Sequence, residues 1–269
     1  MPPPSAVPDD LRRRVGEVGF WWHSIDLGGG IVTPGHKTPG YHAGELQALA
    51  LPELAGRTVL DVGSWDGYYA FHAERAGAAR VVALDHYVWS LDLPRHRAIH
   101  DAQVARGEVG AQPHDLPEVW DPEGLPGKRG FDLAHAELGS AVEPVVGDYA
   151  TLAPETLGRF DVVLFLGVLY HLRDPLGAMR KLHALCDGVA VIETEAIALG
   201  SQPDACLWEF MGTRKHLHDP TNWWAPTRAG LEGICRAAGF SRIEPGPVPD
   251  PQPAPGTTVP FRAVVHAWR

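Results

Sequence analysis

Three acidic residues stand at the ends of short apolar runs, and their spacing is typical of a nucleoside-binding site. Asp61 lies near the end of the run at 58–62, Asp85 follows the run at 80–84, and Asp148 follows a third, shorter run. If such runs form parallel strands, their carboxyl ends open on one crevice, where ligands of this fold class bind. A carboxylate that ends the second strand suits ribose hydroxyls. We therefore predict that Asp85 binds a ribose and that Asp148 accepts a hydrogen bond from an adenine amino group.

The loop that follows Asp61 reads Gly63-Ser64-Trp65-Asp66-Gly67. Gly63 and Gly67 permit a tight turn and a close approach of the backbone to a ligand. A helix is expected to begin near Tyr68, so its first N–H groups face the crevice. A dinucleotide-binding loop has glycine at the position of Trp65, where the backbone contacts pyrophosphate. Trp65 therefore disfavours NAD and favours an adenosine cofactor without phosphate.

Alternation of buried strands and helices is needed to place these residues together. Apolar runs predict strands near 58–62, 80–84, 145–146, 160–166, 189–193, 241–243 and 262–268, and helical periodicity predicts helices near 11–18, 68–76, 175–185 and 227–238. This alternation predicts an α/β fold with a doubly wound, mostly parallel, Rossmann-like sheet whose last strand is antiparallel. Residues 1–54 are predicted to form a short N-terminal extension that covers the cleft, and residues 55–269 the Rossmann-like domain.

One segment interrupts the alternation. About sixty residues separate Asp85 from Val145, whereas a crossover usually needs only a few tens. Residues 92–130 are rich in Pro, Gly, His and charged residues and show no clear period. We interpret them as an insertion, and two alternatives stay open: it borders the substrate pocket, or it is a solvated excursion.

Composition narrows the partners and the compartment. The formal net charge is −10, and the densest basic run is only Arg12-Arg13-Arg14, which disfavours a nucleic-acid partner. No apolar run approaches the ~20 residues of a membrane span. The N-terminus does not resemble a secretory signal, and three widely spaced cysteines suggest no disulfide framework. We expect a cytoplasmic protein without a membrane partner, and no pattern indicates its oligomeric state.

Two strings carry a resemblance to a known family. Residues 60–69 (LDVGSWDGYY) and 165–176 (FLGVLYHLRDPL) resemble the class I S-adenosylmethionine-dependent methyltransferases. The second string is similar to the bacterial tRNA wobble-uridine carboxymethyltransferases and their uncharacterised relatives, and the similarity extends over about 21–240, including 22–27 and 222–227. The resemblance implies a seven-stranded Rossmann-like sheet, methyl-transfer activity and S-adenosylmethionine as the cofactor.

The resemblance also implies roles for individual residues. Asp61 and Trp65 belong to the cofactor loop, in which Gly63, Ser64 and Gly67 would contact the methionine part of the cofactor. Asp85 would bind the ribose, and Asp148 and Tyr149 would contact the adenine edge. The pocket beside the sulfonium would be lined by Leu166, Gly167 and Tyr170. The carboxymethyltransferases hold the extra carboxylate of their cofactor with a lysine shortly before the first strand. Residues 41–50 contain no Lys or Arg, so ordinary S-adenosylmethionine is expected. The N-terminal part is also expected to be too short for that family's helical tRNA-binding region.

Methyl transfer requires alignment of an acceptor with the methyl group and, for many acceptors, a base. His171, Tyr170 and His23 are the candidate catalytic residues, and His171 is the first candidate base because the pKa of histidine suits neutral pH. The alternative is that His171 only braces its loop. The tryptophans of two aromatic segments would wall the substrate pocket, or pack in the core: Trp21, Trp22, Trp223 and Trp224.

Other titratable pairs are weaker candidates. His96/His100 and His216/His218 have metal-like spacing but no carboxylates beside them, so no metal site is predicted. At most one of Glu193 and Glu195 is expected to face the cleft. We expect methylation of a small-molecule acceptor at oxygen, such as a sugar or a secondary-metabolite intermediate. The alternatives are a tRNA wobble-base enzyme and a non-enzymatic cofactor-binding subunit.

Overall fold

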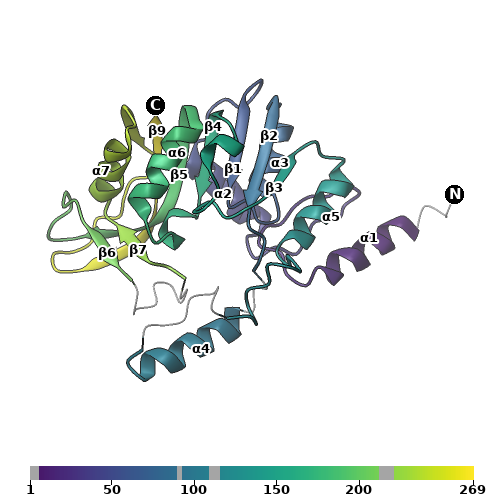
Figure 1. Cartoon of the computed structure of the whole chain (residues 1–269), viewed down its shortest axis with the longest axis horizontal. Coiled ribbons are helices and arrows are strands. Elements are labelled where there is room, and N and C mark those ends of the chain that lie inside the picture. Colours follow the sequence, from purple (N-terminus) through teal and green to yellow (C-terminus); the bar gives the residue numbers. More distant parts are fainter. Residues whose placement is uncertain (1–5, 90–92, 109–115, 212–220) are drawn as a thin grey trace.

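A seven-stranded sheet forms the centre of the protein (Figure 1). The computed structural model describes residues 6–89, 93–108, 116–211 and 221–269 of the chain. The strand order is β3-β2-β1-β4-β5-β9-β8. The strands are β1 (Thr58–Val62), β2 (Arg80–Asp85), β3 (Glu143–Val146), β4 (Phe160–Leu166), β5 (Cys186–Leu199), β8 (Arg242–Pro245) and β9 (Thr258–Trp268). The pairings are parallel except those of β9, which runs antiparallel between β5 and β8. The predicted fold class is confirmed.

The register of the central strands brings their carboxyl ends to one edge. Val62 pairs with Leu84 of β2 and with Phe165 of β4, and Asp85 pairs with Val146 of β3. The loops that follow four strands therefore leave the sheet side by side. This common edge explains why acidic residues far apart in the sequence can form one site.

Alternate residues of the strands face two separate apolar clusters. Val59 and Leu164 pack in one cluster with residues of α1 (Ala6–Glu17), α2 (Pro39–Leu49), α3 (Tyr68–Arg75) and α5 (Lys128–Leu138). Leu60 and Phe165 pack in the other with residues of α6 (Pro175–Leu185) and α7 (Arg228–Ala238). Because both faces of the sheet are covered, its central strands read as continuous apolar runs.

Helix ends follow local side-chain chemistry. Asp174 accepts a hydrogen bond from the Gly177 N–H at the start of α6, where Pro175 stands at the first position. Thr227 caps α7 in the same way, and that helix ends at Gly239, whose φ of 112° suits glycine. The predictions of helices near 175–185 and 227–238 are confirmed.

The predicted insertion contains a helix that periodicity did not indicate. Helix α4 spans Leu93–Ala105, and Figure 1 shows it apart from the helices that cover the sheet. Its apolar residues are spread around the helix, so the sequence carries no amphipathic stripe. Sequence periodicity also missed α2, α5 and a hairpin of two short strands, β6 (Trp208–Phe210) and β7 (Trp224–Pro226).

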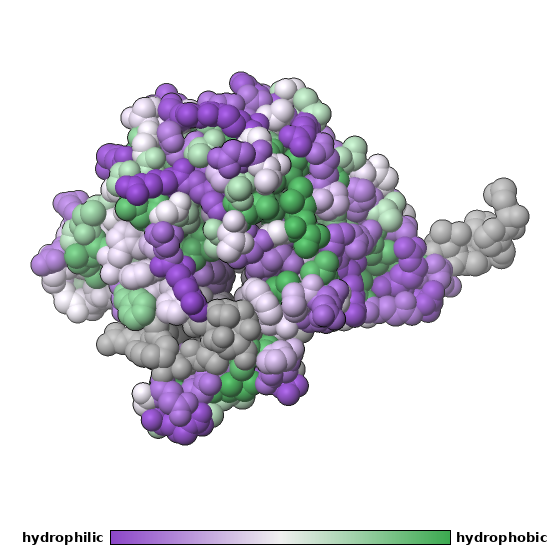
Figure 2. All heavy atoms as spheres, in the orientation of Figure 1, coloured by the Kyte–Doolittle hydropathy of each residue, from purple (hydrophilic) through white to green (hydrophobic). Residues whose placement is uncertain are grey.

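The surface of α1 is solvated and carries paired charges. Figure 2 shows hydrophilic residues over this helix. Arg13 Nη2 lies 2.6 Å from Asp10 Oδ1, and Arg14 Nη1 lies 2.6 Å from Oε1 of Glu137 on α5. The basic run of the sequence is therefore balanced by neighbouring carboxylates. Within the described ranges, the structure contains no helix with the length and apolarity needed to cross a membrane.

Candidate active site

The loop between β1 and α3 has three residues in the left-handed region. The φ angles are 74° for Gly63, 51° for Trp65 and 90° for Gly67. A Cβ at Gly63 would lie 2.6 Å from a methyl group of Val168, so a side chain does not fit there. A Cβ at Gly67 would meet the ring of Phe71. The two glycines are therefore required by the turn, as the sequence predicted, and also by close packing against neighbouring side chains. Their approach to a ligand stays a prediction.

Asp85 ends β2 directly beside this loop. Its Oδ2 accepts a hydrogen bond from the Trp65 backbone N–H at 3.0 Å, and its Oδ1 accepts one from the Tyr87 N–H at 2.8 Å. Burial acts to raise the pKa of Asp85, but contacts with His86 and the two N–H groups hold the pKa below its usual value. The carboxylate is ionised at neutral pH and fixed in orientation. Such a group suits the ribose hydroxyls of the cofactor.

Asp61 is a second buried carboxyl group, at the start of the same loop. Burial raises the pKa of Asp61 to about 7, while the Ser64 hydroxyl acts in the opposite direction. Its Oδ2 is buried and has no hydrogen-bond partner among the described residues. An ammonium group placed beside it would favour the ionised form. The residues of this loop therefore fit S-adenosylmethionine, whose methionine part carries such a cation and which supplies an electrophilic methyl group when bound.

A small hollow lies beside Asp85, the predicted ribose-binding residue. Trp65, Asp85, Tyr87, Trp89 and Gly127 line it. Trp89 forms an isolated bridge with Trp120, and their rings are 5.7 Å apart. The chain just before the insertion and the later part of the insertion thus lie beside Asp85. Whether the insertion also reaches an acceptor stays a prediction.

The loop after β3 is held by α6. The Tyr149 hydroxyl donates to the Ala178 carbonyl at 2.8 Å, and Lys181 Nζ donates to the carbonyls of Tyr149, Ala150 and Leu152 at 2.6–2.9 Å. Asp148 is exposed and accepts a hydrogen bond from the Ala150 N–H. The Tyr149 side chain is engaged in packing, and the adenine contact of this pair stays a prediction.

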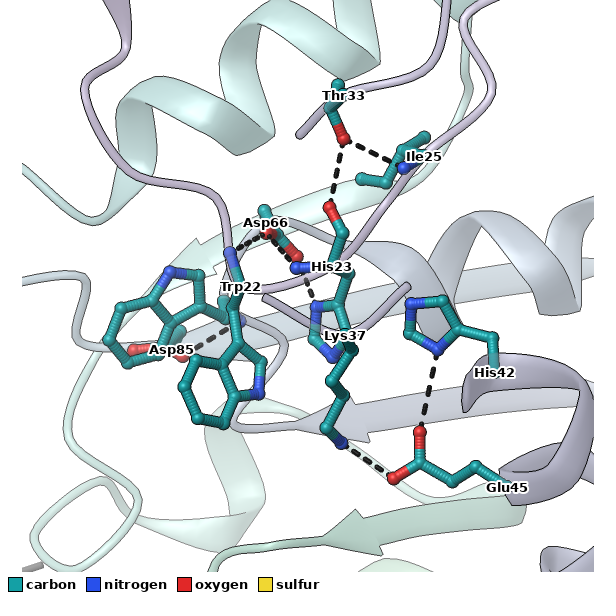
Figure 3. Close-up of polar contacts among 10 residues, drawn as sticks. Trp22, His23, Ile25, Thr33, Lys37, His42, Glu45, Asp66 and Asp85 are labelled. Atoms are coloured by element: carbon teal, nitrogen blue, oxygen red, sulfur yellow. Dashed lines mark hydrogen bonds and ion pairs between the residues drawn. The ribbon is translucent and has the colours of Figure 1, made fainter. Parts of the chain in front are cut away.

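Asp66 ties the N-terminal segment to the cofactor loop (Figure 3). Its Oδ2 accepts hydrogen bonds from the backbone N–H groups of Trp22 and His23, each at 2.8 Å. Its Oδ1 contacts His23 Nδ1. Burial lowers the pKa of His23, and the Asp66 carboxylate opposes this shift. These contacts give His23 a bracing position. Sequence reasoning missed Asp66, although a carboxylate inside a glycine loop was the available signal.

The two tryptophans of this segment have different surroundings. Trp21 is buried, its indole N–H donates to the Val15 carbonyl at 3.0 Å, and it packs on Gly130. Trp21 thus packs in the core, and its contact with a substrate stays a prediction. Trp22 is half-buried, and its ring lies 6.2 Å from that of Trp65 and stacks on His36 at 5.1 Å. Trp22 therefore borders the cofactor loop.

On the acceptor side, the structure brings Tyr170 and His171 together in a short 3-10 helix, η3 (Leu169–His171). Their ring centroids are 4.2 Å apart. His171 Nδ1 lies 2.8 Å from Thr221 Oγ1 and 3.2 Å from the Thr221 carbonyl oxygen. The Trp223 N–H donates to the Tyr170 carbonyl at 2.7 Å, which places the hairpin of β6 and β7 beside η3.

Aromatic side chains gather on that hairpin. The ring of Trp223 is stacked on that of Phe210, with ring centroids 6.1 Å apart. The ring centroid of Trp224 lies 5.2 Å from that of Phe210. Both tryptophans are half-buried, and Phe210 is exposed. Trp223 and Trp224 therefore stand near Tyr170, as a wall of the acceptor side requires. Their contact with a substrate stays a prediction.

A network of charges lies beside Gly167, which follows Leu166 at the end of β4. Arg262 on β9 contacts both carboxylate oxygens of Glu193 and lies 2.6 Å from Glu195 Oε1. A Cβ at Gly167 would lie 3.4 Å from the Tyr170 hydroxyl and 3.5 Å from Arg262 Nη2. Burial acts to lower the pKa of Arg262, but Glu193, Tyr170 and Glu195 raise that pKa well above its usual value.

The expectation that only one of the two glutamates faces the cleft was wrong. Residues i and i+2 of a strand point to the same face, and Glu193 and Glu195 both reach Arg262. Arg262 pairs in register with Glu195 across β5 and β9. The alternation of β5 could have indicated the shared face, but the arginine partner is 69 residues from Glu193.

The histidine pairs give no metal centre among the residues described. His96 and His100 are both buried on α4. No group of three His, Cys, Asp or Glu side chains in the described part of the chain is arranged to hold a metal ion. His216 and His218 lie outside the described residues.

Comparisons with known proteins identify relatives of this chain. The chain is 26% identical over 191 residues to the tRNA U34 carboxymethyltransferase of Desulforapulum autotrophicum, and the match covers 71% of the chain and 46% of the relative. It is 34% identical over 146 residues to the enzyme of the same name from Alcanivorax borkumensis, which covers 54% of the chain and 34% of that relative. The chain spans about half the length of the first of these relatives and a smaller share of the second.

Solved structures support the fold. The N-terminal domain of EvdMO1, crystallised in the presence of SAH and D-fucose, superposes with a TM-score of 0.59 at 17% identity, over 97% of this chain and 96% of that one. Residues 35–244 match the family described as "Methyltransferase domain". That match covers most of the chain and includes the glycine loop, Asp85 and η3. The chain therefore belongs to this methyltransferase-domain family and is a class I S-adenosylmethionine-dependent methyltransferase.

Proposed function

We propose that the enzyme transfers the methyl group to a hydroxyl oxygen of a small molecule, such as a sugar or a secondary-metabolite intermediate. The observation that carries this proposal is the convergence of Tyr170, His171 and the Arg262 network beside Gly167. These groups offer hydrogen bonds and a base within a site that half-buried tryptophans border. Such a combination is the usual form of a site for a small polar ligand.

His171 is the proposed proton acceptor. If its Nδ1 carries the proton and donates it to Thr221, its Nε2 has the lone pair that a general base requires. Nε2 would accept the proton of the acceptor hydroxyl as the methyl group passes from sulfur to the acceptor oxygen, and S-adenosylhomocysteine would leave as the second product. Tyr170 would orient the acceptor, and His23 would act only by holding the N-terminal segment on the cofactor loop.

One solved structure supports the class of acceptor. The N-terminal domain of EvdMO1 shares the fold over nearly the whole chain and was crystallised in the presence of D-fucose, a molecule with several hydroxyl groups. A sugar was therefore present together with SAH in the crystals of a protein with this fold. The identity of 17% leaves the acceptor of this chain to experiment.

A tRNA wobble-uridine modifying (carboxy)methyltransferase is the second candidate. The names of the sequence relatives favour it. Binding of a polyanion requires accessible Lys and Arg. The net charge of −10 and the pairing of Arg13 and Arg14 with carboxylates oppose it. The match covers only about half of the first relative's length, so it does not assign the activity of that whole protein to this chain.

A transfer assay with labelled methyl groups distinguishes the two. The protein is incubated with methyl-labelled S-adenosylmethionine and either the small-molecule fraction of a bacterial extract or total tRNA. We expect label in an acid-soluble product whose formation requires the enzyme, and none in acid-precipitable RNA. Label in tRNA that decreases steeply with added salt would replace this proposal with the second candidate.

A further inference from the structure

Lys181 of α6 binds the loop that follows β3 through all of its hydrogen-bond donors. Its Nζ donates to the backbone carbonyls of Tyr149, Ala150 and Leu152 at 2.6, 2.9 and 2.8 Å. A protonated lysine has three N–H groups, so three donors meet three acceptors of a single loop. The same Nζ lies 5.3 Å from the centre of the Tyr149 ring. Burial lowers the pKa of Lys181, and the Asp148 carboxylate acts in the opposite direction.

Ala150 links this lysine to Asp148. The Ala150 carbonyl accepts a hydrogen bond from Lys181, and the Ala150 N–H donates to Asp148 Oδ1 at 2.8 Å. The N–H groups of Thr151 and Leu152 close the turn on the Asp148 carbonyl. Asp148 is exposed, so packing does not fix its carboxylate. The orientation of this carboxylate therefore depends on the turn that Lys181 holds.

The same turn lies beside the residue predicted to bind the ribose. The Gly147 N–H donates to the backbone carbonyl of Asp85 at 2.9 Å, and Asp85 pairs with Val146 across β2 and β3. Asp148 is thus the next residue along the chain after this contact. A nucleoside whose ribose is bound at Asp85 would have its base near Asp148, as the predicted adenine contact requires.

Removal of the ammonium group would disturb this turn. Three carbonyl oxygens converge on Lys181 Nζ, and their partial negative charges repel one another unless a cation lies between them. Without a donor, these oxygens would turn toward water, because unsatisfied acceptors are unfavourable. The loop would then hold Asp148 in several orientations. A carboxylate that is not fixed discriminates less well between ligands.

We propose that Lys181 is a positioning residue for cofactor recognition. Through Ala150 it fixes the Asp148 carboxylate toward the 6-amino group of adenine, and it thereby sets the preference of the enzyme for an adenine base. Lys181 acts through the loop, since its donors are engaged by the three carbonyls. The inference rests on the predicted adenine contact of Asp148. It does not depend on which acceptor is methylated.

The test compares SAH with its analogue that has hydrogen in place of the 6-amino group of adenine. Titration calorimetry gives both dissociation constants, and their ratio is the readout. K181M removes the ammonium but keeps an unbranched side chain. K181R keeps the charge, but a planar guanidinium cannot direct three N–H groups from one nitrogen. R180M removes one positive charge from the neighbouring, exposed position of α6. D148A removes the acceptor of the amino group and is measured alone and together with K181M.

We expect the wild-type protein to bind SAH about tenfold more tightly than the analogue, the size expected for a hydrogen bond to a charged group. K181M should reduce this preference to about twofold, K181R should lie between K181M and the wild-type protein, and R180M should keep the wild-type ratio. D148A should lose the preference, and K181M should not change the ratio further when combined with D148A, because Lys181 acts through Asp148.

A purely structural role of Lys181 would lower stability, or weaken both ligands equally, and leave the ratio unchanged. An unchanged ratio in K181M, an equal loss of preference in R180M, or equal affinity of the wild-type protein for both ligands would overturn the inference. If K181M does not fold, K181R decides, since a wild-type ratio in that variant also overturns it. The transfer assay can fail on its acceptor while this ratio holds, so the two proposals are separable.

Discussion

The Trp65 backbone N–H donates to Asp85 Oδ2 across 3.0 Å, which joins the cofactor loop to the end of β2. The loop after β1 and the carboxylate after β2 therefore form one rigid unit. The left-handed conformation of Trp65, with φ of 51°, aims its N–H at this carboxylate. Both the shape of the loop and the predicted ribose contact of Asp85 depend on this hydrogen bond.

Replacement of Asp85 by Ala should weaken binding of SAH by about 1.5–3 kcal/mol, the size expected for hydrogen bonds to a charged group. Titration calorimetry measures the change. D85N is the matched variant, because it keeps an oxygen acceptor but loses the charge, and it should lie between the wild-type protein and D85A. Unchanged affinity in D85A would remove Asp85 from the binding site.

Asp61 should make stability and cofactor binding depend on pH. Its pKa is about 7 in the folded protein against an ordinary value of 3.8. A raised pKa means that the folded state holds the proton of Asp61 more tightly than the unfolded state does. The stabilisation of the folded state by this proton is therefore full below about pH 4 and is lost by about pH 7. Without cofactor, D61N should therefore gain melting temperature relative to the wild-type protein as pH rises through this window.

Binding of SAH should reverse the effect, because its ammonium group favours ionised Asp61. Calorimetry at pH 6 in buffers of different ionisation enthalpy should then detect release of a proton from the wild-type protein and none from D61N. Identical pH profiles of the two proteins without cofactor would contradict the assigned protonation of Asp61.

Loss of the Asp66 carboxylate should release the N-terminal segment. D66A leaves the N–H groups of Trp22 and His23 without their buried acceptor, which costs on the order of 2–4 kcal/mol of unfolding free energy. Hydrogen exchange should increase in the segment around Trp22 and His23 before it increases in β1. D26A alters an exposed aspartate of the same segment and serves as the control. Equal exchange in D66A and the wild-type protein would show that other contacts hold the segment.

Replacement of His171 by Ala should lower the turnover number by roughly a hundredfold and leave SAH affinity nearly unchanged, because a general base acts only in the chemical step. T221V should have a smaller effect, since the Thr221 carbonyl can still accept from Nδ1. Undiminished turnover in H171A would leave alignment as the source of catalysis.

Local sequence signals were sufficient to predict the central strands of the sheet and to locate the cofactor loop. Strands β1 and β4 and helix α6 begin and end where the apolar runs and caps predicted, because their signals lie within a few residues of each other. The two glycines around Trp65 also have local causes, a positive φ and a close neighbour. The loop could therefore be recognised without any knowledge of distant contacts.

The roles of residues whose partners are distant in the chain became apparent only from the three-dimensional arrangement. Asp66 meets Trp22 across 44 positions, and Arg262 meets Glu193 across 69. No periodicity reports such pairs, because they form only when strands and loops from separate parts of the chain meet at one edge of the sheet. Burial likewise separated Trp21, which packs in the core, from Trp22, which borders the site. Residue types indicated the chemistry available to this protein, and the three-dimensional arrangement selected which of those residues are brought together.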